Sequence, residues 1–517
     1  MLLLPGLLLL AALANQLMGR TAYAGRTYLY LLYMSSAAGA IWLGWQTGWQ
    51  SGAKGDKTRN LSTIDLVAWA VLLAATANAV IGFAQYLGLS LPTWLAVRLP
   101  TGGRVFGNLR QANLFSLLLV LGIICAAMLF AQRQKSWKLD GFAILLGAAC
   151  ALSLSRTGAV MIWLVCIGAW AGKGLSLPSR RFVAVATISH ALAWGLYSAL
   201  STMSWKVYAP TSTIQLVPGQ GNFSSFRQEI WMGMLQVAQS NFWTGVGTGG
   251  AGHAYFLQDV QGRFDVNMQN AHNLALQIFV EQGGPFVIAW LGILIYVIWA
   301  VRKAWFDPIG RGLFLLLLAF AVHSTLEYPL WYLYFLLPCA FFLGALCSLA
   351  ASPTDSAIQE ANPANFKRLL IGGAAAAVLL IGVAWDYRKI LPVFKGSSAQ
   401  ALSHLEEGYK TLLFTYCVDY AAVANVAVTP ENAATYYRLT KRLHTAVIQP
   451  FTVLNLAMAS QMIGKTDEAA LYLRRLQEIS PTAIEEIWAK LSVPEQEVLA
   501  PAIARMETLD SGSSKRK

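Results

Sequence analysis

Long apolar stretches separated by short polar ones recur along most of the chain. A helix needs about 20 apolar residues to cross a bilayer, because no backbone polar group can stay unpaired in hydrocarbon. The stretches that approach this length are residues 1–18, 25–47, 64–88, 113–131, 140–154, 157–172, 182–204, 284–301, 312–327, 330–350 and 368–385. The pattern therefore predicts an all-α polytopic membrane protein with about 11 transmembrane helices.

The region 140–172 decides this number. It is too long for one span, and a Ser153–Gly158 segment with a charge and a glycine interrupts it. We therefore predict two spans here.

The spans divide the chain into five parts. Residues 1–204 carry seven helices, 205–285 form a large polar loop, 286–385 carry four more helices, 386–509 are a soluble helical domain, and 510–517 are a disordered tail. Within the soluble part, residues 451–480 are typical of one tetratricopeptide-like helix-turn-helix. A single repeat cannot bury its own face, so neighbouring helices or the membrane part must complete it.

The composition supports a membrane protein and excludes other classes. The chain is 56% hydrophobic and 12% charged, and its mean hydropathy is +0.50. Five of the six cysteines lie in apolar spans, which excludes a disulfide framework and a cysteine metal site. The net charge of +13 is dispersed over short loops, so we expect no nucleic-acid partner.

The basic residues divide alternate loops into two sets. One set holds both lysines and arginines: Lys54, Lys57, Arg59, Arg133, Lys135, Lys138, Lys173, Arg180, Arg181, Arg302, Lys303, Arg311, Lys367 and Arg368. The short loops of the other set hold only arginines: Arg20, Arg26, Arg98, Arg104, Arg110 and Arg156. The positive-inside rule makes the first set cytoplasmic. The N-terminus is then cytoplasmic, and the 205–285 loop and the C-terminus are periplasmic, in a bacterial inner membrane.

The basic residues of the outward short loops are all arginines. This favours binding of a lipid that carries phosphate, because one guanidinium group can bind two phosphate oxygens. For Arg20, Arg26 and Arg98, snorkelling at the interface is an equal alternative. Arg156 lies within an apolar region and is a candidate functional residue.

The first long outer loop, residues 88–112, is rich in glycine and proline and is predicted to be irregular. Arg104, Arg110, Gln111 and Asn113 lie at its end, just before the next span. These side chains suit contacts to sugar or phosphate. Capping of the following helix is the alternative.

The 205–285 loop carries three motifs. Ser225 and Gln228 fit a capping box, so we predict a helix to about residue 240, with Arg227 in its first turn, where an anion could bind. The run Gly245–Gly252 follows no strand, so it is interpreted as a flexible turn, not as a dinucleotide loop. His272 then opens an apolar helix. It is either a general base or part of a His272–Asn273 cap.

His323, Glu327 and Tyr328 lie together where the ninth and tenth spans meet. Such groups are costly at membrane depth unless they are paired, so they are candidate site residues.

Three segments of the chain resemble the bacterial general O-oligosaccharyltransferases, a branch of the O-antigen ligase and polymerase superfamily. They are Gly107–Asn113, Ala271–Asn273 with Gly283–Pro285, and Glu327–Pro338. With the helix pattern, the resemblance covers roughly residues 1–350. The family usually has Gly-Gln-Pro-Asn where this chain has Arg110-Gln-Ala-Asn113.

The resemblance implies transfer of a preassembled glycan from undecaprenyl diphosphate to Ser or Thr of periplasmic proteins such as type IV pilins. It implies functional roles for His272, Tyr328 and Gln111, and diphosphate binding by Arg227. From the residues we add Arg156, Arg110 and Arg104 as diphosphate ligands, and Asn273, Glu327, His323 and Asn113 as supporting residues.

We expect no metal and no cofactor, because the outer loops lack a metal-ligand cluster of acidic residues. Direct attack on the donor would invert the anomeric centre. The alternatives are ligation of O-antigen onto lipid A core, O-antigen polymerisation and, from another class, transport of lipid-linked sugars. A transporter would need polar groups along the bilayer midplane.

Overall fold

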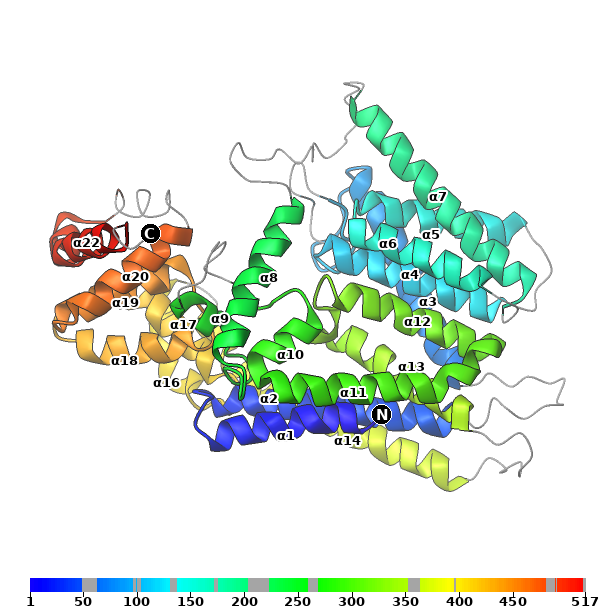
Figure 1. Ribbon diagram of the computed structural model, residues 1–517, viewed down its shortest axis with the longest axis horizontal. Coiled ribbons are helices and arrows are strands. Elements are labelled where there is room, and N and C mark those ends of the chain that lie inside the picture. The colour runs from blue at the N-terminus through cyan, green and yellow to red at the C-terminus, as the bar shows by residue number, and fades with distance from the viewer. Residues whose placement is uncertain are drawn as a thin grey trace. The chain divides into compact units, whose positions relative to one another are not determined.

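All regular secondary structure in the part of the chain that the computed structural model describes is helical, and that part contains no strand. The structure describes residues 1–48, 63–95, 99, 104–130, 137–171, 175–202, 223–258, 268–351, 363–394, 397–479, 489 and 491–514. The chain folds into two compact units (Figure 1). The first consists of residues 1–6, 35–220 and 291–369, and the second of residues 7–34, 221–290 and 370–517.

Each of the eleven predicted spans coincides with a helix. They are α1 (Leu3–Leu17), α2 (Ala24–Gly48), α3 (Thr63–Tyr86), α4 (Ala112–Leu129), α5 (Trp137–Leu152), α6 (Arg156–Trp170), α7 (Leu177–Thr202), α11 (Gly284–Val301), α12 (Pro308–Ser324), α13 (Leu333–Ala351) and α14 (Pro363–Arg388). Residues 140–172 form two helices, as predicted.

Length and hydropathy make five helical segments of the described chain suitable for crossing a membrane. These are Thr63–Tyr86, Ala112–Leu129, Leu177–Ala199, Gly284–Phe306 and Leu333–Ala351, the fourth of which includes the 3-10 turn η2 (Arg302–Phe306). Three shorter helices, α1, α6 and α12, are also apolar. The all-α polytopic membrane fold is therefore confirmed.

Helix α4 is the centre of the first unit. Fifteen of its residues are buried, and α3, α5, α6, α7 and α12 all pack against it. A helix that is apolar on every face must be surrounded by other helices, and that surrounding fixes the position of its N-terminus. The N-termini of α4 and α6 are the ends that carry the polar site residues.

The second unit contains the large loop and the C-terminal helices. The loop forms α8 (Phe223–Ser240), α9 (Ala251–Leu257) and α10 (Leu274–Gln282), which share one apolar cluster. Ile230, Met234 and Ala238, which recur at helical spacing along α8, lie in that cluster. Helix α8 begins at Phe223, so the predicted start at Ser225 is wrong by two residues, and Arg227 lies in the second turn instead of the first.

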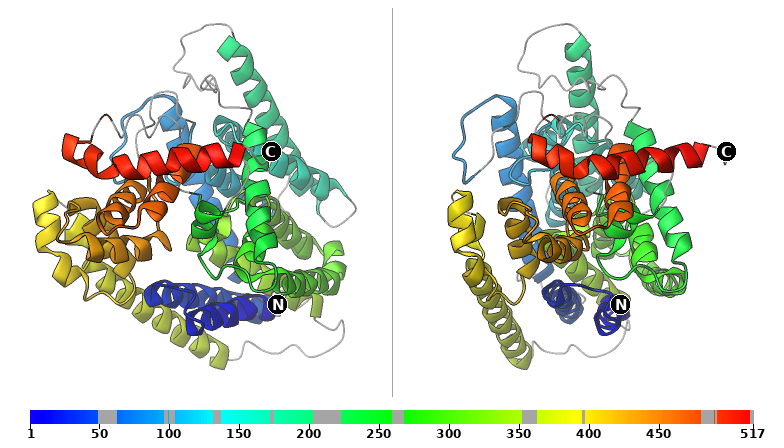
Figure 2. Two further views of the ribbon diagram at one scale, coloured as in Figure 1. Left: turned by 60° about the vertical axis from the view of Figure 1, so that its left-hand side comes forward. Right: turned by 90° about the vertical axis from the view of Figure 1, so that its left-hand side faces the viewer.

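The C-terminal helices pack side by side (Figure 2). They are η4 (Leu391–Phe394), α15 (Ser398–Ser403), α16 (Leu405–Gly408), α17 (Thr415–Asn425), α18 (Ala433–His444), α19 (Pro450–Met462), α20 (Thr466–Ile479) and α22 (Val493–Ser514). Helices α19 and α20 form the expected helix-turn-helix, joined at Gly464 in the left-handed region (φ +79°). Helix α22 continues to Ser514, so the predicted disordered tail is helical over residues 510–514. Residues 515–517 lie outside the described part.

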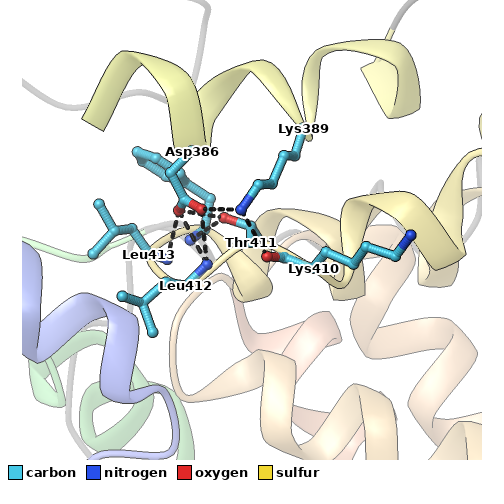
Figure 3. A network of polar contacts seen from close by, with 7 residues as sticks. Asp386, Lys389, Lys410, Thr411, Leu412 and Leu413 are labelled. Carbon is cyan, nitrogen blue, oxygen red and sulfur yellow. Dashed lines mark hydrogen bonds and ion pairs between the residues drawn. The ribbon is translucent and has the colours of Figure 1, made fainter. Parts of the chain in front are cut away.

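Asp386, near the end of α14, holds the start of this C-terminal region (Figure 3). Its carboxylate accepts hydrogen bonds from the Thr411 hydroxyl (2.7 Å) and from the backbone N–H groups of Leu412 (3.0 Å) and Leu413 (2.8 Å). Lys389 donates a further bond at 3.0 Å. Burial raises the pKa of Asp386, but these donors outweigh it and lower the pKa to about 2.

Candidate active site

Asn113 connects three polar side chains at the N-terminal end of α4. Its amide nitrogen donates to Glu327 (2.7 Å), and its amide oxygen accepts from Ser155 (2.8 Å) and Arg104 (3.2 Å). Glu327 is buried, with 4% of its surface exposed. A buried carboxyl group is tolerated only when it is hydrogen-bonded, so Asn113 satisfies the Glu327 carboxyl and orients it. Three of the predicted site residues are therefore brought together.

Polar residues of α3 hold the loop that precedes α4. The Gln85 side chain forms hydrogen bonds with both backbone groups of Gly107, at 2.9 and 3.0 Å, and Asn78 accepts from the backbone N–H of Asn108 at 2.9 Å. Gly107 adopts φ +60°, and a Cβ there would approach Asn78 to 2.6 Å. The segment resembling the family motif is thus fixed in one conformation. Its Arg110 also has a positive φ (+58°), and its side chain is exposed.

Gln111 and Arg156 occupy the first positions of two helices. Gln111 is the N-cap residue of α4, but its side chain makes no capping hydrogen bond, so capping does not explain it. Ser155 caps α6 by accepting from the Gly158 N–H at 3.0 Å, and Arg156 follows as an exposed side chain. Helices α4 and α6 pack on each other, and each N-terminus carries partial positive charge. This end of the first unit therefore suits an anion.

The last turn of α12 carries His323, and the turn that follows it, before α13, carries Glu327 and Tyr328. The carbonyl of His323 accepts from the Glu327 N–H at 2.8 Å, and the His323 side chain is buried. The ring of Tyr328 stacks on Tyr332, with centroids 6.2 Å apart. Burial, together with Tyr332 and Glu327, raises the pKa of Tyr328 to about 12. The phenol therefore keeps its proton at neutral pH and can donate a hydrogen bond.

His272 lies in the second unit, in a turn just before α10. It adopts φ +50°, an uncommon conformation for a residue other than glycine, and it is partly exposed. Asn273 caps α10 by accepting from the Leu276 N–H at 3.0 Å, so the capping role predicted as one alternative belongs to Asn273. Strained backbone at a partly exposed histidine is typical of functional sites.

The glycine run after α8 forms hydrogen bonds with the C-terminal end of α10. The N–H groups of Val246 and Gly247 donate to the carbonyls of Val280 and Glu281, each at 2.9 Å. Gly245 has φ +62°, and a Cβ there would lie 2.3 Å from Glu281 backbone atoms. The run forms a turn, as predicted. It is tightly packed and not flexible, because it satisfies carbonyls that the end of α10 leaves open.

The remaining arginines differ in their surroundings. Arg227 is partly exposed on α8. Arg20 donates to the carbonyl of Thr244 (3.0 Å) and Arg26 to that of Thr445 (3.1 Å), so both contact backbone groups of the second unit. Arg98 lies outside the described residues.

The sequence analysis missed three residues of this region. Ser155 was visible as a serine at a helix start, Ser-Arg-Thr-Gly, but its bond to Asn113 was not. Gln277 and Glu281 were visible only as polar residues in an apolar helical run. The part of the chain that the structure describes contains no group of three or more His, Cys, Asp or Glu side chains suited to a metal ion.

Two segments of the chain match known protein families. Residues 141–291, which include α6, α8 and the His272 turn, match the O-antigen ligase family. Residues 312–489 match the family described as the C-terminal part of the virulence factor membrane-bound polymerase. Both matches support the resemblance to the O-antigen ligase superfamily that the motifs predicted.

The chain is also similar to an individual protein with a described activity. The chain is similar to a general O-oligosaccharyltransferase of Acinetobacter baylyi, with 26% identity over 404 residues. The alignment covers 72% of this chain and 66% of the relative, slightly less than two thirds of the relative's length.

Proposed function

We propose that this protein is an O-linked oligosaccharyltransferase, which moves a preassembled glycan from undecaprenyl diphosphate to Ser or Thr of periplasmic proteins. The observation that carries the proposal is the His272 turn, a partly exposed histidine in strained backbone within the segment that matches the O-antigen ligase family. The similarity to a general O-oligosaccharyltransferase supports a protein acceptor. Type IV pilins are the acceptor that the resemblance suggests.

The reaction forms one bond and breaks another at the anomeric carbon of the donor. The acceptor hydroxyl oxygen attacks that carbon, and the bond from the carbon to the diphosphate oxygen breaks. His272 takes the hydroxyl proton as a general base. Undecaprenyl diphosphate leaves with its additional negative charge, and attack from the opposite side inverts the anomeric centre.

The arginines stabilise that departing charge. We assign Arg104, Arg110, Arg156 and Arg227 as diphosphate ligands, because guanidinium groups supply paired donors to phosphate oxygens. The helix N-termini beside Gln111 and Arg156 favour an anion as well. Tyr328 donates a hydrogen bond from its protonated phenol. The reaction then needs no metal and no cofactor.

This chemistry requires the His272 loop on the side of the membrane where glycans are presented to exported proteins. The distribution of basic residues supports a bacterial inner-membrane protein with a cytoplasmic N-terminus and a periplasmic C-terminus. A reporter inserted after His404 should be accessible from the periplasm. Accessibility from the cytosol would contradict the proposal.

The test is intact-mass analysis of pilins in a ligase-null host that carries a lipid-linked glycan. We expect one glycan mass per modified pilin with the wild-type chain. His272→Ala should lower transfer by roughly 100-fold or more, the usual contribution of a general base. His404→Ala, at an exposed histidine of the C-terminal region, is the matched control. Undiminished transfer by His272→Ala would remove the base assignment, and loss of transfer in purified protein on chelation would remove metal independence.

The O-antigen ligase match favours a second candidate, transfer of the glycan to lipid A core, and the polymerase match favours chain extension. Both use sugar acceptors. The same host supplied with core oligosaccharide separates the three: modified lipopolysaccharide indicates a ligase, longer lipid-linked chains a polymerase, and modified pilin the proposed activity.

A further inference from the structure

Two side chains hold the His272 turn by hydrogen bonds to the backbone of its neighbour Ala271. The Oε1 atom of Gln277 accepts a hydrogen bond from the Ala271 N–H at 2.7 Å. The indole N–H of Trp231, on α8, donates to the Ala271 carbonyl at 3.0 Å. Both backbone groups of the residue before His272 are therefore occupied, so Ala271 cannot rotate without breaking two hydrogen bonds.

Gln277 is in turn oriented by Glu281. Gln277 is buried, with 3% of its surface exposed, and its amide N–H donates to the Glu281 carboxylate at 2.7 Å. The Ala271 N–H can only donate, and an ionised carboxylate can only accept. One amide orientation satisfies both partners, with oxygen towards Ala271 and nitrogen towards Glu281. The reverse orientation would lose both bonds.

The surroundings of Glu281 set its charge state. Burial raises the pKa of Glu281 to about 7, although a bond from Gln277, the backbone N–H of Gly249 and the charge of Arg26 on α2 all favour the ionised form. Tyr30, also on α2, is a further titratable group that faces this carboxyl. Arg26 lies against Gly249, where a Cβ would approach its guanidinium to 2.7 Å.

We propose that Gln277 and Glu281 are positioning residues that hold the His272 turn in its reactive conformation, with ionised Glu281 fixing the Gln277 amide. The inference rests on the proposed role of His272 as a base. Neither residue touches the substrate. When Glu281 is protonated, its bond from Gln277 loses charge assistance and the amide is no longer fixed in one orientation. The transfer rate should therefore fall as the pH drops below about 7.

The stability of the fold has the opposite dependence on Glu281. The pKa of this carboxyl is higher in the folded protein than in the unfolded chain, so its protonation favours folding. That contribution is complete below about pH 4.5 and is lost as the pH rises through about 7. A residue that served only stability would not lower the transfer rate at the pH where its protonation stabilises the fold.

The first experiment replaces Gln277. In the full-length protein with a lipid-linked glycan and a pilin peptide, Gln277→Leu should lower kcat about 10- to 100-fold, because misplacing a reacting group by about 1 Å costs this much. The KM for the donor should not change. Gln239→Leu, at an exposed glutamine on α8, is the matched control and should retain wild-type kinetics.

The second experiment exchanges the pair. Gln277→Glu alone places two carboxylates beside each other and should abolish transfer. The double variant Gln277→Glu/Glu281→Gln restores one acceptor for the Ala271 N–H and one donor for the carboxylate, and should recover most of kcat. Glu281→Gln alone should raise the melting temperature at pH 8. Its kcat should fall, and the decrease of kcat towards acid pH should differ from that of the wild type. Glu406→Gln, at an exposed glutamate, should change neither.

The outcomes separate this inference from the proposed function. If His272→Ala is inactive while Gln277→Leu and Glu281→Gln keep wild-type kcat and pH profile, the positioning role is overturned and the base assignment stands. If the exchanged pair stays as inactive as Gln277→Glu, the hydrogen-bond exchange is wrong. If His272→Ala is fully active, the base assignment fails and the positioning role fails with it, whereas absence of glycan transfer by the wild-type chain would overturn the proposed function itself.

Discussion

The polar residues of the first unit act through shared hydrogen bonds instead of individual charges. Asn113 is the clearest case, because its amide meets a carboxylate on one side and a hydroxyl and a guanidinium on the other. An amide can do this because it carries a donor and an acceptor on one rigid group. Alanine could replace none of these contacts.

Asn113→Ala should therefore destabilise the protein and lower transfer. We expect a loss of about 1–3 kcal/mol, since the buried Glu327 carboxylate loses a donor, and at least a tenfold drop in transfer. Thermal melting in detergent and glycan transfer measure the two effects. Asn108→Ala, at an exposed asparagine in the loop that precedes α4, is the control. If the two variants have the same stability and the same transfer rate, Asn113 does not have this connecting role.

Tyr328→Phe tests whether the Tyr328 hydroxyl acts as a donor. The ring can keep its stacking on Tyr332, so we expect kcat to fall roughly tenfold while the donor KM stays constant. Since the pKa of this phenol is raised to about 12, the wild-type and variant pH profiles should run parallel between about pH 6 and 9. Tyr334→Phe, an exposed tyrosine nearby, should have little effect. A changed profile shape would mean that Tyr328 exchanges a proton.

At the scale of elements, helix ends explain most of the local structure. Asn273 and Ser155 cap helix starts, and the glycine turn at Gly245 closes a helix end. Asp386 plays the equivalent role for a loop, since it accepts two backbone N–H groups that have no helical partner (Figure 3). Such contacts decide where one element begins relative to the previous one.

Asp386→Asn should loosen the 411–413 segment. Replacing the carboxylate removes charge-assisted bonds worth about 1.5–3 kcal/mol. Because the pKa of Asp386 is lowered to about 2, its contribution is present above about pH 4 and is lost as the pH falls through about 2. Amide exchange at Leu412 and Leu413 should accelerate at neutral pH. Asp467→Asn, whose side chain is 78% exposed, is the control. Unchanged exchange would contradict the anchoring role.

At the scale of the whole molecule, the second unit joins distant parts of the chain around the buried His444. Phe256 of α9 stacks on Tyr472 of α20, with centroids 6.5 Å apart, and meets His444 edge-on at 6.2 Å. The His444 Nε2 lies 3.0 Å from the Thr452 hydroxyl. Burial lowers the pKa of His444 to about 3, with a smaller effect from His253, whose own pKa burial also lowers.

The second unit should therefore be sensitive to acid. The unfolded chain takes up protons on these histidines near pH 6.5, whereas the folded protein does not, so stability is present above that pH and is lost as the pH falls towards 3. Proteolysis of the C-terminal region should accelerate between pH 7.5 and 5.5. His444→Gln should reduce this dependence, and His404→Gln, at an exposed histidine, should not. Equal acid sensitivity in both variants would exclude His444.

The sequence by itself determined the helical membrane fold, the eleven helical stretches and the resemblance to the O-antigen ligase superfamily. Apolar stretches of spanning length admit no other structure in a bilayer, and the Glu327–Pro338 motif is local in the chain. Helix starts were predicted less accurately, because α8 begins two residues before the Ser225 that the capping-box pattern favours.

Tertiary structure alone decided the polar partners. Asn113 and Glu327 are 214 residues apart, and no periodicity links them. Likewise Gln277 and Glu281 appear in the sequence as two polar residues in an apolar run, and their contacts to Ala271 and Gly249 depend on how a turn and a glycine loop fold back on α10. Hydrogen bonds need both partners within about 3 Å, and only the folded chain sets that distance.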